Sequence, residues 1–295
     1  MIDRRHFLRA ACGTLAFAGI GAAWAKGAAN APKATLAERL AAIEAGSGGR
    51  LGVAVFDTHT GARHGHRDGE RFPMCSTFKF LLASAVSRQV ERGEERFERT
   101  IPIAQGDVVP NSAFAEKRVG RGATVQELCE ATMIYSDNAA ANLLLPIVGG
   151  PEGLTRFARD IGDTVTRLDR DEPELGTAFP GDERDTTSPR AMVDNLERIV
   201  LGDVLDAASR ERVTGWLRNN TTGGKRLRAG LPKDWIVGDK TGSGANGTTN
   251  DIAVIWPPGR KPLLVAAYLT HATVGDDARY AVHAAVARAV ARSLG

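Results

Sequence analysis

The sequence predicts an α+β fold of the α/β-sandwich type, with a five-stranded, mostly antiparallel sheet flanked by helices. Apolar runs typical of buried strands occur near both ends of the chain, and patterns with helical periodicity occupy the middle. We therefore expect one sheet built from both terminal regions and an all-helical subdomain inserted between them. The active site is expected where the two meet.

The first expected elements are a short helix near residues 35–44 and a hairpin of two strands, 51–56 and 63–67, joined by the turn His59-Thr60-Gly61. Helices follow at 78–91, 125–135, 139–148, 154–161, 189–201 and 207–217. Strands return at 235–239, 251–256 and 263–270, and an alanine-rich helix is expected at 277–294. The predicted domain spans residues 26–295, with a sheet subdomain of about 26–74 plus 219–295 and a helical subdomain of about 75–218.

Residues 1–25 are typical of an export signal. A basic segment that contains Arg4 and Arg5 precedes the apolar run 10–24, and Ala23-Trp24-Ala25 fits a cleavage site. The paired arginines resemble a twin-arginine signal, and an ordinary secretory peptide is the alternative. We expect a periplasmic or secreted protein, cleaved near Ala25. The apolar run is too short and glycine-rich to span a membrane, and Cys12 precedes most of it, so no stable membrane anchor is expected.

The net charge of the chain argues against nucleic acid and anionic membranes as partners. The formal net charge is +3, and the predicted signal carries three arginines and one aspartate, which leaves the mature chain near +1. Such a balanced chain does not favour nucleic acid or an anionic membrane. His64 and His66 have the spacing of a metal-binding pair, but no cysteine or acidic cluster stands at ligand spacing, and a solvated turn explains them. No metal and no cofactor are predicted.

Ser76 is the candidate nucleophile. Lys79 follows it by three residues, so a helix beginning at Ser76 places both side chains on one face, with the amine beside the hydroxyl oxygen. The amine can then help to remove the serine proton. The unpaired N–H groups of the helix N-terminus would stabilise a developing oxyanion.

Two further motifs follow in order. Ser136-Asp137-Asn138 lies between two helical runs, where it serves as an N-cap, projects side chains into a cleft, or does both, with Asp137 structural. Lys240-Thr241-Gly242 follows a predicted strand. It is either part of a turn-forming Gly/Ser loop or the source of a lysine that points into the cleft as a fixed positive charge for an anionic substrate.

The ordered set of Ser76-x-x-Lys79, Ser136-Asp137-Asn138 and Lys240-Thr241-Gly242 resembles the penicillin-recognising serine enzymes, and class A β-lactamases in particular. The resemblance extends over residues 135–145, 149–153, 167–174 and 238–242, and so over essentially the whole mature chain. It implies hydrolysis of the β-lactam amide bond of penicillins and cephalosporins, antibiotic resistance, and a monomer. The alternatives are a penicillin-binding D,D-peptidase and a β-lactam sensor that stays acylated.

The resemblance also assigns roles. Glu172, in the loop 167–175, corresponds to the glutamate that activates the deacylating water, and Glu174 is the rival carboxylate. The presence of Glu172 argues against both the D,D-peptidase and the β-lactam sensor. Lys79 or Glu172 would act as the acylation base, and backbone N–H groups of Ser76 and Ser243 would form the oxyanion hole. Ser136 would pass a proton to the lactam nitrogen, and Asn138 would hold the acyl-amide side chain. The substrate carboxylate would be bound by Lys240, Thr241, Gly242, Ser243 and Arg226.

Several positions depart from the family pattern. Gly176 replaces an asparagine that helps to hold the deacylating water, which predicts slower turnover of hindered substrates, and Asn111 replaces an aromatic residue that lines the cleft. Ala83 and Gly244 occupy the positions of the cysteines that would pair with Cys129 and Cys75 in relatives, which predicts two free thiols. The resemblance further implies an ion pair between Arg170 and Asp185 that holds the loop of Glu172.

Overall fold

The structure, a computed structural model, describes residues 34–294. The predicted export signal 1–25, with Cys12 and the cleavage site near Ala25, lies outside the described residues. Within the described part, no helix combines the length and the apolar character needed to cross a bilayer.

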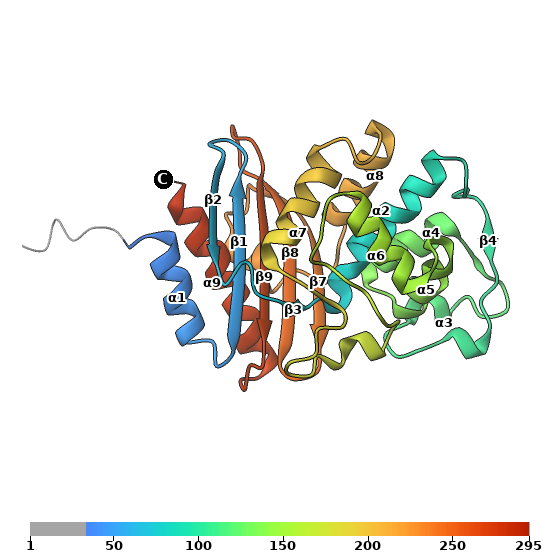
Figure 1. The fold of residues 1–295 in the computed structure, drawn as a ribbon, viewed down its shortest axis with the longest axis horizontal. Coiled ribbons are helices and arrows are strands. Elements are labelled where there is room, and N and C mark those ends of the chain that lie inside the picture. Colours follow the sequence, from blue (N-terminus) through green and yellow to red (C-terminus); the bar gives the residue numbers. More distant parts are fainter. Residues whose placement is uncertain (1–33, 295) are drawn as a thin grey trace, which may run out of the picture. The chain divides into compact units, whose positions relative to one another are not determined.

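Five strands form one antiparallel sheet in the order β2-β1-β9-β8-β7 (Figure 1). They are β1 (Arg50–Asp57), β2 (Ala62–His66), β7 (Ile236–Gly244), β8 (Thr248–Trp256) and β9 (Leu263–Thr270). The first two strands and the last three of the chain therefore share one sheet, which confirms the predicted fold class. All of the pairings in this sheet are antiparallel.

One boundary was wrong in a way that matters for the site. The sequence predicts that the strand 235–239 ends before Lys240, whereas β7 continues to Gly244. Lys240 pairs with Ile252 of β8, and Gly242 pairs with Asn250. The ladder to β8 outweighs the turn propensity of the glycines and serine, so the Lys-Thr-Gly motif lies within a strand and not in a loop after it.

The predicted helices are all present, with ends that shift by a few residues. The α-helices are α1 (Leu36–Ala45), α2 (Phe78–Glu91), α3 (Ala113–Glu116), α4 (Val125–Glu130), α5 (Asn138–Leu144), α6 (Gly150–Asp160), α7 (Pro189–Leu196), α8 (Ala207–Arg218) and α9 (Asp276–Ser293). Tighter or wider single turns are η1 (Cys75–Thr77), η2 (Gln105–Asp107), η3 (Ala131–Tyr135), η4 (Leu145–Val148), η5 (Glu174–Thr177), η6 (Glu197–Leu201) and η7 (Leu227–Gly230).

Elements of four residues or fewer were not predicted, because they are too short to show a period. Besides α3, they are the two-residue strand pairs β3 (Phe72–Pro73) with β6 (Thr186–Thr187), and β4 (Thr100–Ile101) with β5 (Ala123–Thr124).

Alternate residues of the sheet serve two hydrophobic cores. In β9, Val265 and Leu269 pack with the residues of α1 and α9, such as Leu40 and Val286. Ala266 and Tyr268 belong instead to the core formed with the middle helices. Because successive side chains of a strand point to opposite faces, the sheet is covered by helices on both sides, as a sandwich requires.

Helix α2, which follows the candidate nucleophile, is buried over most of its length. Every residue from Phe78 to Ser87 is buried. Its polar side chains are satisfied locally, since Ser84 donates to the Phe80 carbonyl at 2.7 Å and Ser87 to the Ala83 carbonyl at 2.8 Å. A helix buried all round has no freedom to shift, so it holds the residues at its N-terminal end in fixed positions.

Candidate active site

Ser76, Lys79 and Glu172 meet at the N-terminal end of α2. The Ser76 hydroxyl donates to Glu172 Oε1 at 3.1 Å, and Lys79 Nζ donates to Ser76 Oγ at 3.1 Å. Lys79 Nζ also lies 3.1 Å from Glu172 Oε1. Lys79 and Glu172 are buried, whereas Ser76 remains partly exposed. A reachable hydroxyl in contact with an amine and a carboxylate is suited to nucleophilic catalysis.

The backbone around Ser76 is unusual. The sequence predicts a helix that begins at Ser76, but Ser76 lies in the tighter turn η1, and α2 begins at Phe78. Cys75 has φ +44°, a conformation that non-glycine residues rarely adopt. Asn250 of β8 stabilises this turn, because its side-chain amide donates to the carbonyls of Pro73 at 2.8 Å and Met74 at 2.9 Å. The strained residue thus lies directly before the candidate nucleophile, and strained residues are common at active sites.

Strand β7 passes very close to the same turn. A Cβ atom added to Gly242 would lie 2.8 Å from the Met74 carbonyl oxygen and 3.2 Å from the Ser76 backbone nitrogen. Only glycine permits this approach. Ser243, whose backbone N–H is predicted to form an oxyanion hole with that of Ser76, directly follows this point of contact.

The Lys79 amine has more acceptors than protons. Besides Ser76 Oγ and Glu172 Oε1, it reaches the Ser136 carbonyl oxygen at 2.9 Å and Asn138 Oδ1 at 2.6 Å. An ammonium has three N–H donors for these four acceptors. Burial lowers the pKa of Lys79, an effect opposed by the Glu172 carboxylate. The lowered pKa increases the population of neutral amine, which can accept the serine proton.

The motif Ser136-Asp137-Asn138 provides the predicted N-cap, and its other two residues contact the two buried lysines. Asp137 is the N-cap of α5, where Oδ1 accepts from the Ala140 N–H at 2.9 Å, so it is structural. Asn138 holds Lys79 and donates to the Pro110 carbonyl at 2.9 Å. Ser136 has φ +61°, and its hydroxyl accepts a hydrogen bond from Lys240 Nζ at 2.9 Å.

Lys240 is fully buried and points toward Ser136. Burial lowers its pKa well below the ordinary value, and the charge of nearby Lys79 adds to the effect. Its Nζ also donates to the Thr241 carbonyl at 2.9 Å. The two lysines therefore approach Ser136 from two elements, α2 and β7, and donate hydrogen bonds to its carbonyl and hydroxyl oxygens.

The loop of residues 167–185, here the Glu172 loop, is fastened at both ends. Arg170 Nε donates to Asp185 Oδ2 at 2.6 Å, and Asp185 Oδ1 accepts from the N–H groups of Asp169 and Arg170. Asp185 is almost fully buried, so the predicted ion pair is present and shielded from water. Glu172 is buried in this loop, whereas the rival Glu174 is exposed.

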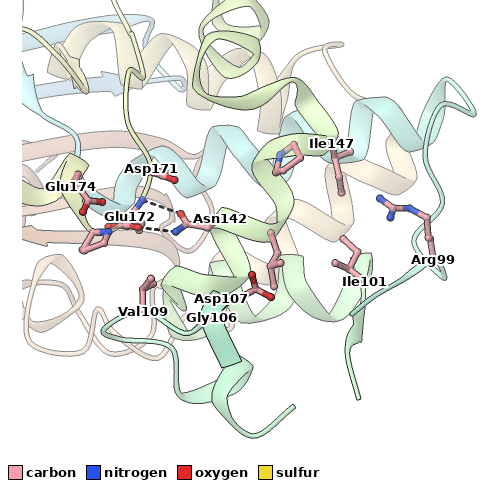
Figure 2. Close-up of a pocket in the computed structure, with 13 residues that line it drawn as sticks. Arg99, Ile101, Gly106, Asp107, Val109, Asn142, Ile147, Asp171, Glu172 and Glu174 are labelled. Atoms are coloured by element: carbon pink, nitrogen blue, oxygen red, sulfur yellow. Dashed lines mark hydrogen bonds between the residues drawn. The ribbon is translucent and has the colours of Figure 1, made fainter. Parts of the chain in front are cut away.

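Asn142 of α5 binds the backbone of Glu172 from the other side (Figure 2). Its side-chain amide donates to the Glu172 carbonyl at 2.7 Å, and its Oδ1 accepts from the Glu172 N–H at 2.9 Å. Both residues line a cavity of about 710 Å³, together with Asp171 and Glu174. Sequence reasoning missed Asn142, although its position four residues after Asn138, on the same face of α5, was a usable signal.

Arg226 completes the site at the edge of β7. This buried guanidinium donates to the carbonyls of Gly242 at 2.7 Å and Asn250 at 2.5 Å, and to Ser243 Oγ at 2.6 Å. It also lies 4.8 Å from the centre of the Tyr280 ring. Ser243 is exposed, so its hydroxyl connects a buried cation to the open side of the strand.

Two other sequence predictions concern histidines and thiols. His66 Nε2 lies 2.7 Å from Glu44 Oε2, and the described residues contain no group of three metal-ligating side chains. Cys75 and Cys129 are free and buried, as predicted. A Cβ at Gly244 would lie 2.6 Å from Cys75 Sγ, so position 244 is indeed adjacent to this thiol.

Known proteins are similar to this chain over most of its length. A model of the β-lactamase enzyme family matches residues 35–294. β-Lactamase OXY-2 of Klebsiella oxytoca is 47% identical over 270 residues, which cover 92% of this chain and 93% of that protein. β-Lactamase L2 of Stenotrophomonas maltophilia is 46% identical over 303 residues and is matched over 100% of both chains. Among solved structures, the class A β-lactamase of the last common ancestor of Gram-negative bacteria has a TM-score of 0.88 and 61% identity, with 89% of this chain and 100% of that chain covered.

Proposed function

This chain belongs to the class A β-lactamases, and we propose that it hydrolyses the amide bond of penicillins and cephalosporins through an acyl-enzyme on Ser76, released by a water that Glu172 activates. The observation that carries the proposal is the contact of one hydroxyl with two candidate bases. Ser76 Oγ lies 3.1 Å from both Lys79 Nζ and Glu172 Oε1. Hydrolysis of these drugs gives antibiotic resistance.

In the first step, Ser76 Oγ attacks the lactam carbonyl carbon, and Lys79 or Glu172 takes its proton. The N–H groups of Ser76 and Ser243 stabilise the oxyanion. The carbon–nitrogen bond then breaks, and the Ser136 hydroxyl passes a proton to the departing nitrogen. Lys240 supports this transfer, because its hydrogen bond to Ser136 Oγ favours the more negative oxygen.

In the second step, a water attacks the ester carbon, and its proton goes to Glu172. Ser76 leaves and regains a proton. Asn142 and the ion pair between Arg170 and Asp185 support this role, since they fix the backbone on both sides of the carboxylate. Gly176 offers no side chain to help hold the water.

Substrate is held from two sides. Asn138 binds the acyl-amide side chain, and the substrate carboxylate binds at the edge of β7, through Lys240, Thr241, Gly242, Ser243 and Arg226. Thr241 Oγ1 and Thr222 Oγ1 lie 2.5 Å apart, which orients the Thr241 hydroxyl. The positive charges of Lys240 and Arg226 favour a substrate that carries a carboxylate.

Mass spectrometry of the purified protein after mixing with a penicillin tests the proposal. The unmodified enzyme should return to its free mass within seconds, and Ser76→Ala should never gain the mass of the drug. Glu172→Gln should stay acylated, because loss of a general base slows hydrolysis by about 10²- to 10⁴-fold. The matched control is Glu174→Gln, which removes an exposed carboxylate two residues away and should turn over normally.

A lasting adduct on the unmodified enzyme would instead identify a β-lactam sensor. Release of D-alanine from peptidoglycan stem peptides, with slow drug hydrolysis, would identify a D,D-peptidase. We also propose that residues 1–25 direct export to the periplasm or the medium and that the mature enzyme is a monomer. Cell fractionation and light scattering test these two points, and a cell-bound cytoplasmic product or a stable dimer would contradict them.

A further inference from the structure

The segment that carries Arg226 is held against β7 by a ladder of side-chain contacts. Because side chains alternate along a strand, the odd-numbered residues 239, 241 and 243 share one face of β7. Arg226 donates to Ser243 Oγ at 2.6 Å, and Arg228 Nε donates to Asp239 Oδ1 at 2.7 Å. The position of Arg226 therefore depends on the Arg228–Asp239 contact two residues further along the segment.

A second carboxyl group binds Leu227, the residue between Arg226 and Arg228. Asp251 of β8 accepts the Leu227 N–H at 3.0 Å through Oδ2. Asp251 pairs with Thr241 in the sheet, and Asp239 pairs with Ala253, so the two acids are diagonal neighbours on one face. Arg226 is thus followed directly by two residues, Leu227 and Arg228, that are each bound by one of these acids.

One oxygen of each acid lacks a partner among the residues that the structure describes. They are Asp239 Oδ2 and Asp251 Oδ1, and both side chains are fully buried. Two adjacent ionised carboxylates with unsatisfied buried oxygens would be costly. A single proton removes both defects, because a neutral Asp251 can donate from Oδ1 to Asp239 Oδ2. The proton is assigned to Asp251, since Asp239 is the acid that contacts the Arg228 guanidinium.

The surroundings agree with this assignment. Burial raises the pKa of Asp251 well above its ordinary value, and the Asp239 carboxylate raises it further through its charge and its hydrogen bond. Gly223 packs directly against this pair, because a Cβ at Gly223 would lie 1.7 Å from Asp239 Oδ2. The Asp239 oxygen without a partner is therefore covered by Gly223 on one side, and the carboxyl group of Asp251 is the buried group that can donate to it.

We propose that Asp239 and Asp251 share one proton and act as positioning residues that fix Arg226, and through it the cation that receives the substrate carboxylate. The effect on substrate selection rests on the proposed function, whereas the shared proton does not depend on it. Neither acid touches substrate. Their effect is confined to how well the enzyme selects a β-lactam that carries a carboxylate.

The first arm of the test counts the proton. Infrared spectra of the full enzyme at pH 7, with ¹³C-labelled aspartate, should contain the C=O band of one buried protonated carboxylic acid. The band should be absent from Asp251→Asn. Its absence from the unmodified enzyme, or its persistence in Asp251→Asn, would overturn the shared proton whatever the enzyme's activity.

The second arm measures selectivity with a penicillin and its methyl ester. Asp251→Asn keeps an acceptor for Leu227 N–H and a donor for Asp239, so it should keep the acid-to-ester ratio of kcat/KM within about twofold. Asp251→Ala loses both and should lower that ratio about tenfold, chiefly through KM for the acid, the size expected when a charge-assisted contact is weakened. Equal losses for acid and ester, or a loss in Asp251→Asn as large as in Asp251→Ala, would overturn the positioning role. If Asp251→Ala does not fold, Asp251→Val, which also lacks an acceptor and a donor, provides the same comparison. Failure of all variants and the unmodified enzyme to hydrolyse either compound would contradict the proposed function and leave the infrared arm to decide the proton.

Discussion

Replacing Asn142 with alanine tests whether the placement of Glu172 limits the release of the acyl group. The side chain makes two hydrogen bonds to the Glu172 backbone, at 2.7 and 2.9 Å. Each contributes about 1 kcal/mol, so the correctly placed loop should lose about 2 kcal/mol relative to displaced ones. Because 1.4 kcal/mol corresponds to a tenfold change, deacylation should slow by about 30-fold.

The assay is rapid-quench mass spectrometry, which resolves acylation from deacylation. If Lys79 is the acylation base, acylation in Asn142→Ala should change less than threefold while the acyl-enzyme accumulates; if Glu172 is the base, both steps should slow together. The control is Asn246→Ala, which removes contacts of Asn246 Nδ2 to the carbonyls of Thr177 and Ala178 further along the same loop. Unchanged deacylation in Asn142→Ala, or an equal effect of Asn246→Ala, would refute the reasoning.

Three further experiments test other parts of the structure. A Cβ at Gly176 meets no atom within 4 Å, so Gly176→Asn should fit, offer a hydrogen bond to the deacylating water and speed hydrolysis of bulky cephalosporins about fivefold; a matching gain in Gly176→Ala would contradict this reason. Burial lowers the pKa of His283 to about 3 from 6.5, so the unfolded chain gains its proton first as the pH falls. The contribution of His283 to the free energy of unfolding is complete above pH 6.5 and should fall by up to about 1.4 kcal/mol per pH unit between pH 6.5 and 3. Unfolding free energies from urea titrations at several pH values should therefore depend less steeply on pH in His283→Gln. An unchanged pH dependence would exclude this residue as the cause. Burial raises the pKa of Cys75 to about 12 and that of Cys129 even further, so neither thiol should react with a disulfide reagent at pH 8 until the protein unfolds, and rapid labelling of the native enzyme would contradict this burial.

Much of the fold was predictable because long elements carry their own signal. The strand Leu263–Thr270 and the helix Phe78–Glu91 were predicted with the bounds that the structure has. Each is continuous in character over eight residues or more, so the apolar pattern alone defines it. The end of β7 was missed because Gly242 and Gly244 lower strand propensity locally, and only pairing with β8 compensates for them.

The candidate site also contains residues that the sequence could predict and residues that it could not. Ser76, Lys79 and Lys240 belong to short motifs that the sequence displays, and the structure brings them together with Ser136 and Glu172. The supporting residues escaped notice, because their partners lie far away in the chain. Asn142 binds a backbone 30 residues distant, and Asn250 binds carbonyls more than 170 residues distant. Such contacts depend on tertiary packing, which no local period encodes.

The alternation of faces along β7 makes the length of this strand a functional constraint. Lys240 points to Ser136, while its neighbours Asp239 and Thr241 point to the segment of Arg226. A one-residue insertion or deletion between positions 239 and 243 would reverse the facing of the residues on one side of the change, so Lys240 and the contacts of Ser243 to Arg226 could not both be kept. Active natural or engineered relatives should therefore keep the number of residues between positions 239 and 243 unchanged.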